Sequence, residues 1–428
     1  MPTTAKRVEA KAAPTSNQET EDFLAVLQKL NLSPPKASAP EASAFKFWRT
    51  QAVVGLHEPP PNDHGHFWIP VPASEVRGDP LKLPDGYMWC HLDLTNSSDA
   101  KDMYTLLSAH YCEDNGGRFR LDYSIDFLTW ALTSPGHFPT WHVGVRHVAT
   151  QKLMAFIGGT PKLIRAHHDI APTCEINFLC IHKKLRNKRL APVLIKEVSR
   201  RVKLENVWRA VYTGASLLPT PVATTQCYHR PLNTKKCIDV GFAHCPPNTP
   251  LTHMIKSLKL PETPQILGFQ PLRAEHVPQV TALLRAHHAS LDLAMEWTEA
   301  DVAHWLLPRS GVVDSFVVVD PSTNQVTDCC SYYHLPMSVL NHPEHKTFRT
   351  AYSFYHVATS VPLVDLLVDL MVMAKNHDMD IFSAVDIMDL HGVLEPLQFV
   401  AGSGHLYYYL FNWRCPPMTP DKVGLVFH

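Results

Sequence analysis

The chain has 428 residues, enough for two or three packed units of about 100–200 residues each. Its 39 lysine and arginine residues nearly balance its 40 aspartate and glutamate residues, so no bulk charge attracts nucleic acid or an anionic membrane. Apolar runs stay short of the ~18 residues that span a bilayer, and the ten cysteines form no CxxC pair, which favours a reducing, cytoplasmic protein without a metal site.

Residues 1–44 are rich in Ala, Pro, Ser, Thr, Glu and Lys, and they lack the apolar core of a signal peptide. This composition predicts a mobile leader. Within it, Phe23, Leu27 and Leu30 recur at helical spacing, and the two prolines at 34–35 would end a helix. One short amphipathic helix is therefore expected in the leader.

From residue 45 onward the sequence predicts the same series of elements twice. Each series has a strand, a helix, a second helix around a tryptophan, a β-hairpin, a further strand and a closing helix. In the first series, the elements before the closing helix fall at 89–94, around 103–107, around Trp130, at 141–151 and at 175–182. In the second series they fall at 266–272, around 280–284, around Trp305, at 315–324 and at 352–358.

Equivalent residues of the two series are separated by 175–177 positions. This agreement indicates a duplication and predicts an α/β (α+β) fold, in which two pseudo-twofold-related halves share one continuous, saddle-shaped sheet flanked by helices. Two unrelated α+β domains are the alternative. The boundary between the halves is placed between residues 225 and 226. The equivalent pairs are Leu107 with Leu284, Trp130 with Trp305, and Phe178 with Phe354.

The segment 175–196 carries the most chemical information. An apolar strand at 176–181 leads into five cations within 183–189, and a helix with an apolar stripe follows at 190–202. The free N–H groups and positive dipole end of a helix favour an anion here, such as the pyrophosphate and 3′-phosphate of coenzyme A. A solvated basic loop or a nuclear-import patch is the alternative, but the apolar strand and helix on either side anchor the loop in a core.

This segment resembles the signature of the eukaryotic N-myristoyltransferases (glycylpeptide N-tetradecanoyltransferases), and the pattern is most similar to the protozoan branch of that family. Further similar segments cover nearly the whole chain from about residue 45. They are Phe47-Trp48-x-Thr-Gln, Phe119-Arg120-x-Asp-Tyr-Ser124, Trp141-His-Val-Gly-Val-Arg146, Ala210-Val-Tyr-Thr213, Leu217-Leu-Pro-Thr-Pro221, His229-Arg230, Leu306-Leu-Pro-Arg309 and Gly404-His405.

The resemblance implies a tandem GNAT-type fold with an acyl-CoA-binding half at 45–225 and a half at 226–428 that carries the peptide site and the C-terminal carboxylate. It also implies that a monomer transfers myristoyl from myristoyl-CoA to the N-terminal glycine of peptides or nascent proteins. Myristoyl-CoA would be a co-substrate, and no tightly bound cofactor is expected. A closed apolar pocket would select the acyl length, since each buried methylene contributes ~0.8 kcal/mol.

For catalysis, the resemblance implies an oxyanion hole made by the backbone N–H groups of Phe178 and Leu179, with the α-carboxylate of His428 as the base. The apolar run at 423–427 supports a buried terminus, although chain ends usually fray. An α-amino group has a pKa of ~7.7–8.0 and an α-carboxyl group a pKa of ~3.3–3.7. Burial must bring these two pKa values closer before the carboxylate can take a proton from the substrate ammonium. The family usually ends in Leu or Gln. The imidazole of His428 could assist as a base or disturb the pocket, and both possibilities stay open.

The resemblance also implies two sets of binding residues, in which cations meet the CoA phosphates and aromatic side chains pack the pantetheine and acyl groups. The acyl-CoA set is Phe45, Lys46, Phe47, Trp48, Tyr111, Phe178, Leu179, Cys180, Ile181, Arg186, Asn187, Lys188, Arg189, Leu190, Ala191 and Pro192. The peptide set is Asp114, Phe119, Thr213, His229, Tyr333, Tyr352 and Ser403.

Three peptide-side positions depart from the family pattern. Ser403 stands where the family has an acid, Cys227 where it usually has Tyr, and Ser383 where it has a substrate-facing Asn. We therefore expect acyl-CoA binding to be retained and peptide affinity or preference to differ. An acyl-CoA-binding pseudoenzyme, or an acyltransferase with another acceptor such as a lysine ε-amine, is the alternative.

Overall fold

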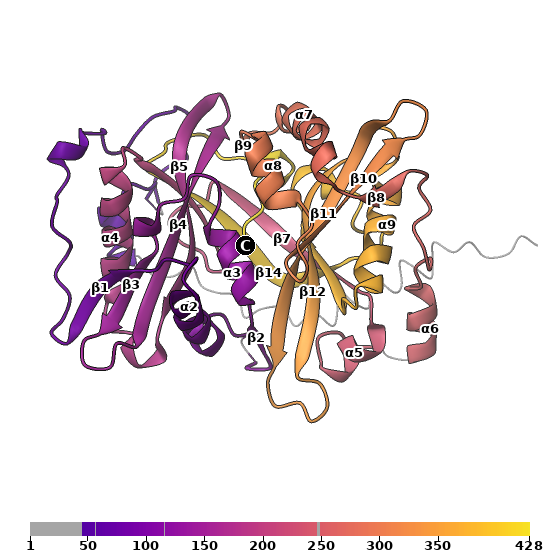
Figure 1. The fold of residues 1–428 in the computed structure, drawn as a ribbon, viewed down its shortest axis with the longest axis horizontal. Coiled ribbons are helices and arrows are strands. Elements are labelled where there is room, and N and C mark those ends of the chain that lie inside the picture. Colours follow the sequence, from indigo (N-terminus) through magenta and orange to yellow (C-terminus); the bar gives the residue numbers. More distant parts are fainter. Residues whose placement is uncertain (1–44, 56, 115, 246–248) are drawn as a thin grey trace, which may run out of the picture.

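The structure is a computed structural model that describes residues 45–55, 57–114, 116–245 and 249–428. The short helix expected within 1–44 lies outside these residues. The described strands form one mixed sheet of fifteen strands, on which eight described α-helices pack (Figure 1). The predicted α/β class and the single continuous sheet are confirmed.

The first half of the chain follows the predicted order of elements, and its helix α4 covers the outer side of the sheet (Figure 1). Short strand β2 (Phe119–Leu121) is an addition that pairs with the other half. The main elements are β1 (Tyr87–His91), α2 (Ser97–His110), α3 (Ile125–Leu132), β3 (Val143–His147), β4 (Leu153–Ala166), β5 (Asp169–Ile181), α4 (Leu190–Leu204) and β6 (Arg209–Gly214).

The second half repeats this order, with α9 in the place of α4 (Figure 1). Its elements are β8 (Phe269–Pro271), α7 (Val277–His288), α8 (Glu299–Leu306), β10 (Val313–Asp320), β11 (Gln325–Val339), β12 (Thr347–Val357), α9 (Leu363–Asn376) and β13 (Ile381–Val385). The remaining helices and strands are α5 (Thr234–Asp239), α6 (Leu251–Ser257), β7 (Ala223–Pro231), β9 (Leu293–Met295), β14 (Val400–Phe411) and β15 (Val423–Gly424).

The strand order of the sheet makes the duplication visible. It runs β1-β3-β4-β5-β6-β14-β7-β13-β12-β11-β10-β8. The strands of the first half occupy one side of the sheet and those of the second half the other. Read from each outer edge toward the centre, the two halves follow the same order. The two central strands are exchanged between the halves. Strand β7 follows β6 in the chain but pairs with β13, and β14 follows β13 but pairs with β6. Each half therefore completes the sheet of the other.

The two tryptophan helices, α3 and α8, meet between the halves. Trp130 Nε1 donates to the carbonyl of His304 (2.9 Å), and His304 Nε2 donates to the carbonyl of Trp130 (2.8 Å). The rings of Trp130 and Trp305 contact each other edge to face at 5.1 Å. This reciprocal contact is what a pseudo-twofold axis produces, and it supports duplication over two unrelated domains.

Predicted and observed strand boundaries differ at several places, and β5 and β12 begin six and five residues before their predicted starts at 175 and 352. Strand β1 ends at His91, three residues before the predicted end. Strand β8 is shorter than 266–272 because Gly268 has a φ of +83°, and a Cβ there would lie 2.1 Å from the carbonyl oxygen of Val319. Trp141 lies in a 3₁₀ turn (Pro139–Trp141) that precedes β3. Turn residues at a strand end account for the differences at β8 and before β3.

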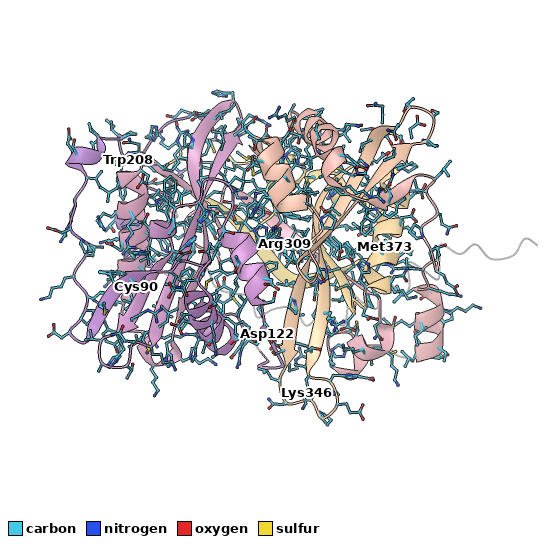
Figure 2. The ribbon with its side chains drawn as sticks, viewed as in Figure 1. Cys90, Asp122, Trp208, Arg309, Lys346 and Met373 are labelled. Carbon is cyan, nitrogen blue, oxygen red and sulfur yellow. The ribbon has the colours of Figure 1, made fainter. Side chains whose placement is uncertain are left out.

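Side chains fill the space between the sheet and its helices (Figure 2). Trp208 and Met373, both labelled there, mark the outer parts of the two halves. The largest apolar core spans both halves and includes Trp130, Trp305 and the C-terminal residues Leu425 to Phe427. Among the described residues, no helix has the length and apolar character that crossing a membrane requires.

Candidate functional site

Strand β5 carries a β-bulge at Phe178 and Leu179. On β4, Phe156 pairs with Cys180 and Gly158 with Asn177, so these two β5 residues oppose the single residue between them. Strand β6 pairs with β5 only at 173–175. The bulge therefore disrupts the ladder locally and leaves one extra residue of β5 without a partner on β4.

The backbone at the bulge has an uncommon conformation. Phe178 has a φ of +56°, a region that a bulky side chain rarely adopts and that is often found at functional sites. Its ring is buried against Tyr111 and Tyr123 at centroid distances of 6.1 and 5.4 Å. Opposite the bulge, a Cβ at Gly158 would lie 2.7 Å from Leu132 Cδ2. Packing on both sides thus holds the bulge in place.

A cavity of about 460 Å³ opens beside this bulge, within the ~300–1,000 Å³ typical of ligand sites. One part is apolar and lies between α4 and the sheet. The other part contains polar groups and the chain end. The apolar wall is Ile157, Cys174, Ile176, Ile195, Val198, Val202, Val207 and Ala210; the other wall includes Tyr111, Cys112, Asn177, Phe178, Leu179, Thr213 and His428.

The C-terminal segment reaches this cavity through the centre of the molecule (Figure 1). Three tyrosines from the sheet fix its main chain. Tyr408 donates to the carbonyl of Leu425 (2.9 Å), Tyr333 donates to the carbonyl of Phe427 (3.0 Å), and the hydroxyl of Tyr355 accepts from the N–H of Val426 (3.3 Å). The prediction that residues 423–427 are buried is confirmed.

The side chain and the main chain of the last residue, His428, have different surroundings. The side chain of His428 is 0% exposed, although the residue as a whole is half-buried and lines the cavity. Its exposed atoms therefore belong to the main chain at the terminus. The imidazole is closed off from solvent and stacks on Trp305, with a centroid distance of 4.9 Å and an interplanar angle of 16°.

A buried ion pair lies below the imidazole. Lys162 Nζ is 3.2 Å from Glu175 Oε2, and Asn177 Nδ2 donates to Glu175 Oε1 at 2.6 Å. Burial alone would raise the pKa of Glu175, but the charge of Lys162 and the contact with His428 outweigh it, so the pKa lies below its ordinary value. A buried carboxylate therefore stays ionised directly beneath the cavity wall.

The basic loop predicted to bind phosphates precedes α4. The side chains of Lys184, Lys188 and Arg189 are exposed, and no carboxylate pairs with them among the described residues. Arg186 is used differently, since it donates to the carbonyls of His110 and Ile181 and ties the loop to the sheet. The loop thus presents three unpaired cations beside the first turn of α4, which begins at Leu190.

The other predicted acyl-CoA residues lie around this corner. Trp48, in a 3₁₀ turn (Trp48–Thr50), stacks on Tyr212 at 5.8 Å, and Phe47 lies under Lys196 Nζ at 6.0 Å. Among them, Trp48, Tyr111, Phe178 and Leu179 line the cavity. The residues that do not line it are Phe45, Lys46, Phe47, Cys180, Ile181, Arg186, Asn187, Lys188, Arg189, Leu190, Ala191 and Pro192.

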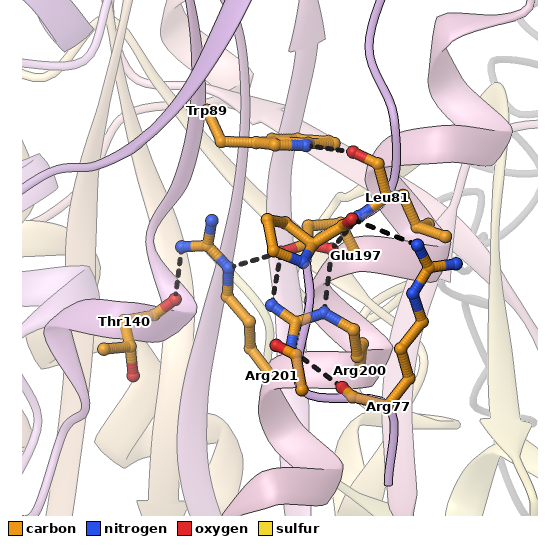
Figure 3. A network of polar contacts seen from close by, with 9 residues as sticks. Arg77, Leu81, Trp89, Thr140, Glu197, Arg200 and Arg201 are labelled. Carbon is orange, nitrogen blue, oxygen red and sulfur yellow. Dashed lines mark hydrogen bonds and ion pairs between the residues drawn. The ribbon is translucent and has the colours of Figure 1, made fainter.

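A polar network clamps α4 to the chain segment that crosses it (Figure 3). Glu197 is fully buried and accepts from Arg200 (2.7 Å), Arg201 (2.9 Å) and the N–H of Leu81 (3.1 Å). Burial would raise the pKa of Glu197, but these hydrogen bonds outweigh it and lower the pKa. Because Val198 and Val202 of the same helix line the cavity, the clamp also fixes the apolar wall.

The predicted peptide-side residues do not form one cluster. Thr213 lines the cavity, and Tyr352 stacks on Tyr333 at 5.0 Å. Asp114 accepts from the N–H groups of Gly116, Arg118 and Phe119 and so shapes its own loop. Phe119 is buried in a separate cluster with Phe348.

The positions that depart from the family pattern lie near His229. Its Nδ1 is 2.8 Å from Ser383 Oγ, and burial lowers the pKa of His229 to about 4. Ser403 is exposed in an irregular part of β14 that Gln226 supports through the carbonyls of Gly402 and Gly404. Cys227 lies on β7 and is half-buried.

Two family models match the chain. They are "Myristoyl-CoA:protein N-myristoyltransferase, N-terminal domain" over residues 69–227 and the corresponding C-terminal domain over 239–426. The chain belongs to the N-myristoyltransferase family. The prediction of this family is thereby confirmed, and with it the prediction of an acyltransferase, a glycylpeptide N-tetradecanoyltransferase, with myristoyl-CoA as co-substrate.

Individual relatives agree with this assignment. Glycylpeptide N-tetradecanoyltransferase 1 of Arabidopsis thaliana is 44% identical over 397 residues, covering 91% of this chain and 90% of that protein. Glycylpeptide N-tetradecanoyltransferase 2 of Danio rerio is 45% identical over 382 residues, covering 89% and 77%. A crystal structure of Saccharomyces cerevisiae N-myristoyltransferase with bound myristoyl-CoA has a TM-score of 0.86 and 35% identity, covering 90% of this chain and 99% of that one.

Sequence reasoning missed two groups of residues. The Lys162–Glu175 pair joins neighbouring strands, and only the register of β4 and β5 shows that these side chains share a face. The tyrosines that hold the chain end come from three strands, and Tyr333 among them was predicted only for the peptide side. Of the cavity wall, the sequence indicated the part on α4, because the predicted apolar stripe of this helix includes Val198 and Val202, which line the cavity. Among the residues that the structure describes, no cluster of His, Cys, Asp and Glu is arranged to hold a metal ion.

Proposed function

We propose that the protein transfers myristoyl from myristoyl-CoA to the N-terminal glycine amine of a protein substrate by direct attack, with the α-carboxylate of His428 as base. One observation carries this proposal: the bulge at Phe178 and Leu179 and the main-chain end of the chain line the same cavity. In this proposal the main-chain N–H groups of the bulge are the oxyanion donors, and the terminal carboxylate is the proton acceptor.

The proposed reaction has two steps. The carboxylate of His428 takes a proton from the glycine ammonium, and the amine nitrogen attacks the thioester carbonyl carbon. The N–H groups of Phe178 and Leu179 stabilise the negative oxygen that forms, and removing such a donor typically costs ~10²–10³ in rate. The oxyanion then re-forms the carbonyl as the C–S bond breaks, the nitrogen gives its surplus proton to the departing CoA thiolate, and the amide and free CoA remain.

The two cysteines of the cavity argue against a covalent acyl-enzyme. Burial raises the pKa of Cys112 and of Cys174, so both stay as thiols at neutral pH. A thiol is a much weaker nucleophile than a thiolate. The acyl group is therefore expected to pass to the amine without an intermediate on the protein.

The proposed placement of the co-substrate follows the charges. The CoA phosphates would meet Lys184, Lys188 and Arg189 at the start of α4, and the acyl chain would lie between α4 and the sheet. Asp114, Phe119, Thr213, His229, Tyr333, Tyr352 and Ser403 remain predictions for the peptide side. The serines at 383 and 403 and Cys227 lead us to expect an altered peptide preference.

Further predictions accompany the proposed activity. The boundary between 225 and 226, the division into an acyl-CoA half and a peptide half, and the monomeric state stay predictions. A cytosolic location agrees with ten free cysteines. The relationship to the protozoan branch also stays a prediction, which a family tree would test.

A transfer assay tests the proposal. Full-length protein is mixed with myristoyl-CoA and a panel of peptides with N-terminal Gly or with internal Lys, and free CoA and product mass are measured. Glycine-acylated product is expected. Binding of myristoyl-CoA without turnover would indicate a pseudoenzyme, and product only on lysine would indicate another acceptor.

Adding one glycine after His428 tests the base. The added residue moves the carboxylate from the cavity, so turnover should fall by at least about 10²-fold, since misplacing a reacting group by ~1 Å can cost that much. Myristoyl-CoA binding, measured by calorimetry, should persist. The matched control inserts the same glycine between Ala5 and Lys6, where it cannot become an N-terminal acceptor. An unchanged rate in the C-terminal variant would contradict the carboxylate as base.

A further inference from the structure

The imidazole of His428 is enclosed by five aromatic rings. Besides Trp305, the ring centroids of Trp130 (4.7 Å), Phe354 (5.5 Å), Tyr333 (5.6 Å) and Phe127 (6.1 Å) surround it. The side chain has no exposure to the cavity, so a bound amine cannot contact its nitrogens. The imidazole therefore neither acts on a substrate directly nor occupies the space of one.

Burial alone does not account for a histidine at this position. Both imidazole nitrogens are buried, and neither has a hydrogen-bond partner among the described residues. A buried polar group without a partner costs ~1–3 kcal/mol, which an apolar side chain of similar size would avoid. Burial lowers the pKa of His428, so the ring is neutral at neutral pH. The use of these polar atoms therefore depends on which charged groups face the two imidazole nitrogens.

Of the charged side chains that the structure describes around the ring, Glu175 is the one that faces an imidazole nitrogen. Its Oε1 lies 3.8 Å from His428 Nδ1 and accepts the 2.6 Å hydrogen bond from Asn177. Asn177 is the residue immediately before the bulge. One carboxylate oxygen thus faces both the chain end and the bulge. Lys162 balances its charge and also lies 4.1 Å from the Trp305 ring centroid, on which the imidazole stacks.

The other titratable groups around the ring cannot take over this contact. Tyr333 on β11 uses its hydroxyl to hold Phe427. His304 on α8 uses its Nε2 to donate to Trp130, and burial lowers its pKa to about 4. Among the side chains described around the ring, the β4–β5 pair of Lys162 and Glu175 presents charge toward the imidazole, through the carboxylate.

We propose that His428 is a positioning residue, whose imidazole is held between the aromatic rings and Glu175 so that the terminal carboxylate keeps a fixed place relative to the bulge at Phe178. The inference rests on the proposed function. Glu175 is the shared support, because it accepts the hydrogen bond of Asn177 beside the bulge, and its charge faces His428 Nδ1 at 3.8 Å, where it orients the imidazole dipole without a hydrogen bond. A loss of either contact changes the distance between base and oxyanion donors without changing the acyl-CoA pocket.

Two substitutions at the terminus separate stacking from the polar contact. His428→Phe keeps an aromatic ring between the five surrounding rings and removes the two nitrogens, whereas His428→Ala removes both the ring and the nitrogens. We expect kcat for glycine-peptide acylation to fall about tenfold in the first and about 10²-fold in the second, because small displacements of reacting groups cost rates of this size. The KM and Kd for myristoyl-CoA should stay within about twofold.

A double-mutant cycle tests the role of Glu175. Glu175→Gln should lower kcat in the wild-type background, and it should have less than a third of that effect in the His428→Phe background, because its partner is already gone. If the Gln variant does not fold, as shown by its circular dichroism spectrum, Glu175→Asp keeps the charge and retracts the carboxylate by one methylene.

The outcomes separate the inference from the proposed function. Wild-type kcat in either His428 variant, losses of kcat matched by equal losses of myristoyl-CoA affinity and thermal stability, or additive effects in the cycle would overturn the positioning role. A wild-type protein that acylates no glycine peptide would instead overturn the proposed function. A selective fall in kcat with coupling between Glu175 and His428 supports the inference.

Discussion

Ala210 shows how a single side chain can set the size of the cavity. It lies on β6, pairs in register with Cys174 of β5, and belongs to the apolar wall opposite α4. The other residues of this wall are larger, whereas alanine contributes only a methyl group and so leaves space in the cavity at this point. A larger side chain at position 210 would occupy space that the acyl chain is proposed to use.

Replacing Ala210 with Leu should therefore shorten the preferred acyl group. Two methylenes contribute ~1.6 kcal/mol of burial, so the ratio of kcat/KM for twelve- over fourteen-carbon acyl-CoA should rise by about tenfold. Rates with a series of acyl-CoA lengths measure this shift. Ala210→Gly is the matched control, which should move the preference in the opposite direction, and an unchanged preference in both variants would place the acyl chain elsewhere.

Helix α4 serves three parts of the structure at once. Its first turn lies beside the unpaired cations, one face lines the cavity, and Glu197 on another face holds the segment around Leu81 (Figure 3). Arg200 also donates to the carbonyls of Arg77 and Gly78. The position of the cavity wall therefore depends on a carboxylate that does not touch the cavity.

Glu197→Gln tests this dependence. Removing the charge leaves Arg200 and Arg201 without their buried partner, and breaking such a pair costs ~3–5 kcal/mol. The free energy of unfolding in urea should fall by about that amount, and myristoyl-CoA affinity should fall with it. The same change at Glu205, exposed at the end of α4, is the control and should alter neither quantity. Equal effects of the two variants would contradict the clamp.

Buried neutral histidines are spread over the whole molecule. Burial lowers the pKa of His288 to about 3 and those of His229, His304 and His356 to about 4, against an ordinary value of 6.5. The unfolded chain therefore binds protons before the folded one does as the pH falls. Stability is complete above pH 6.5 and declines toward pH 4, where the folded state begins to bind the same protons.

The free energy of unfolding should accordingly be lower at pH 5 than at pH 7.5. Each buried histidine contributes on the order of 1–3 kcal/mol to this difference. Urea titrations at the two pH values measure it. His356→Leu should make the difference smaller, because both imidazole nitrogens of His356 are buried without a partner in the described structure. The same pH difference in the wild type and the variant would argue against a role for His356.

The sequence predicted the parts of the fold that depend on local patterns. The helices around Trp130 and Trp305 and the duplicated order followed from apolar spacing, and the basic corner before Leu190 followed from charge. The bulge at Phe178 could not be predicted from spacing, because a bulge depends on the partner strand. The contact of Glu175 with His428 joins residues 253 positions apart, and no pattern in one sequence encodes it.

The exchange of β7 and β14 has a consequence for how the chain folds. Val211 of β6 pairs with Leu410 of β14. The edge of β6 therefore stays unpaired until nearly two hundred further residues have been synthesised. Closing so long a loop is slow, and an open edge invites pairing with other chains. Newly made first halves should thus depend on rapid docking of the second, and we expect aggregation rather than activity when synthesis stops between them.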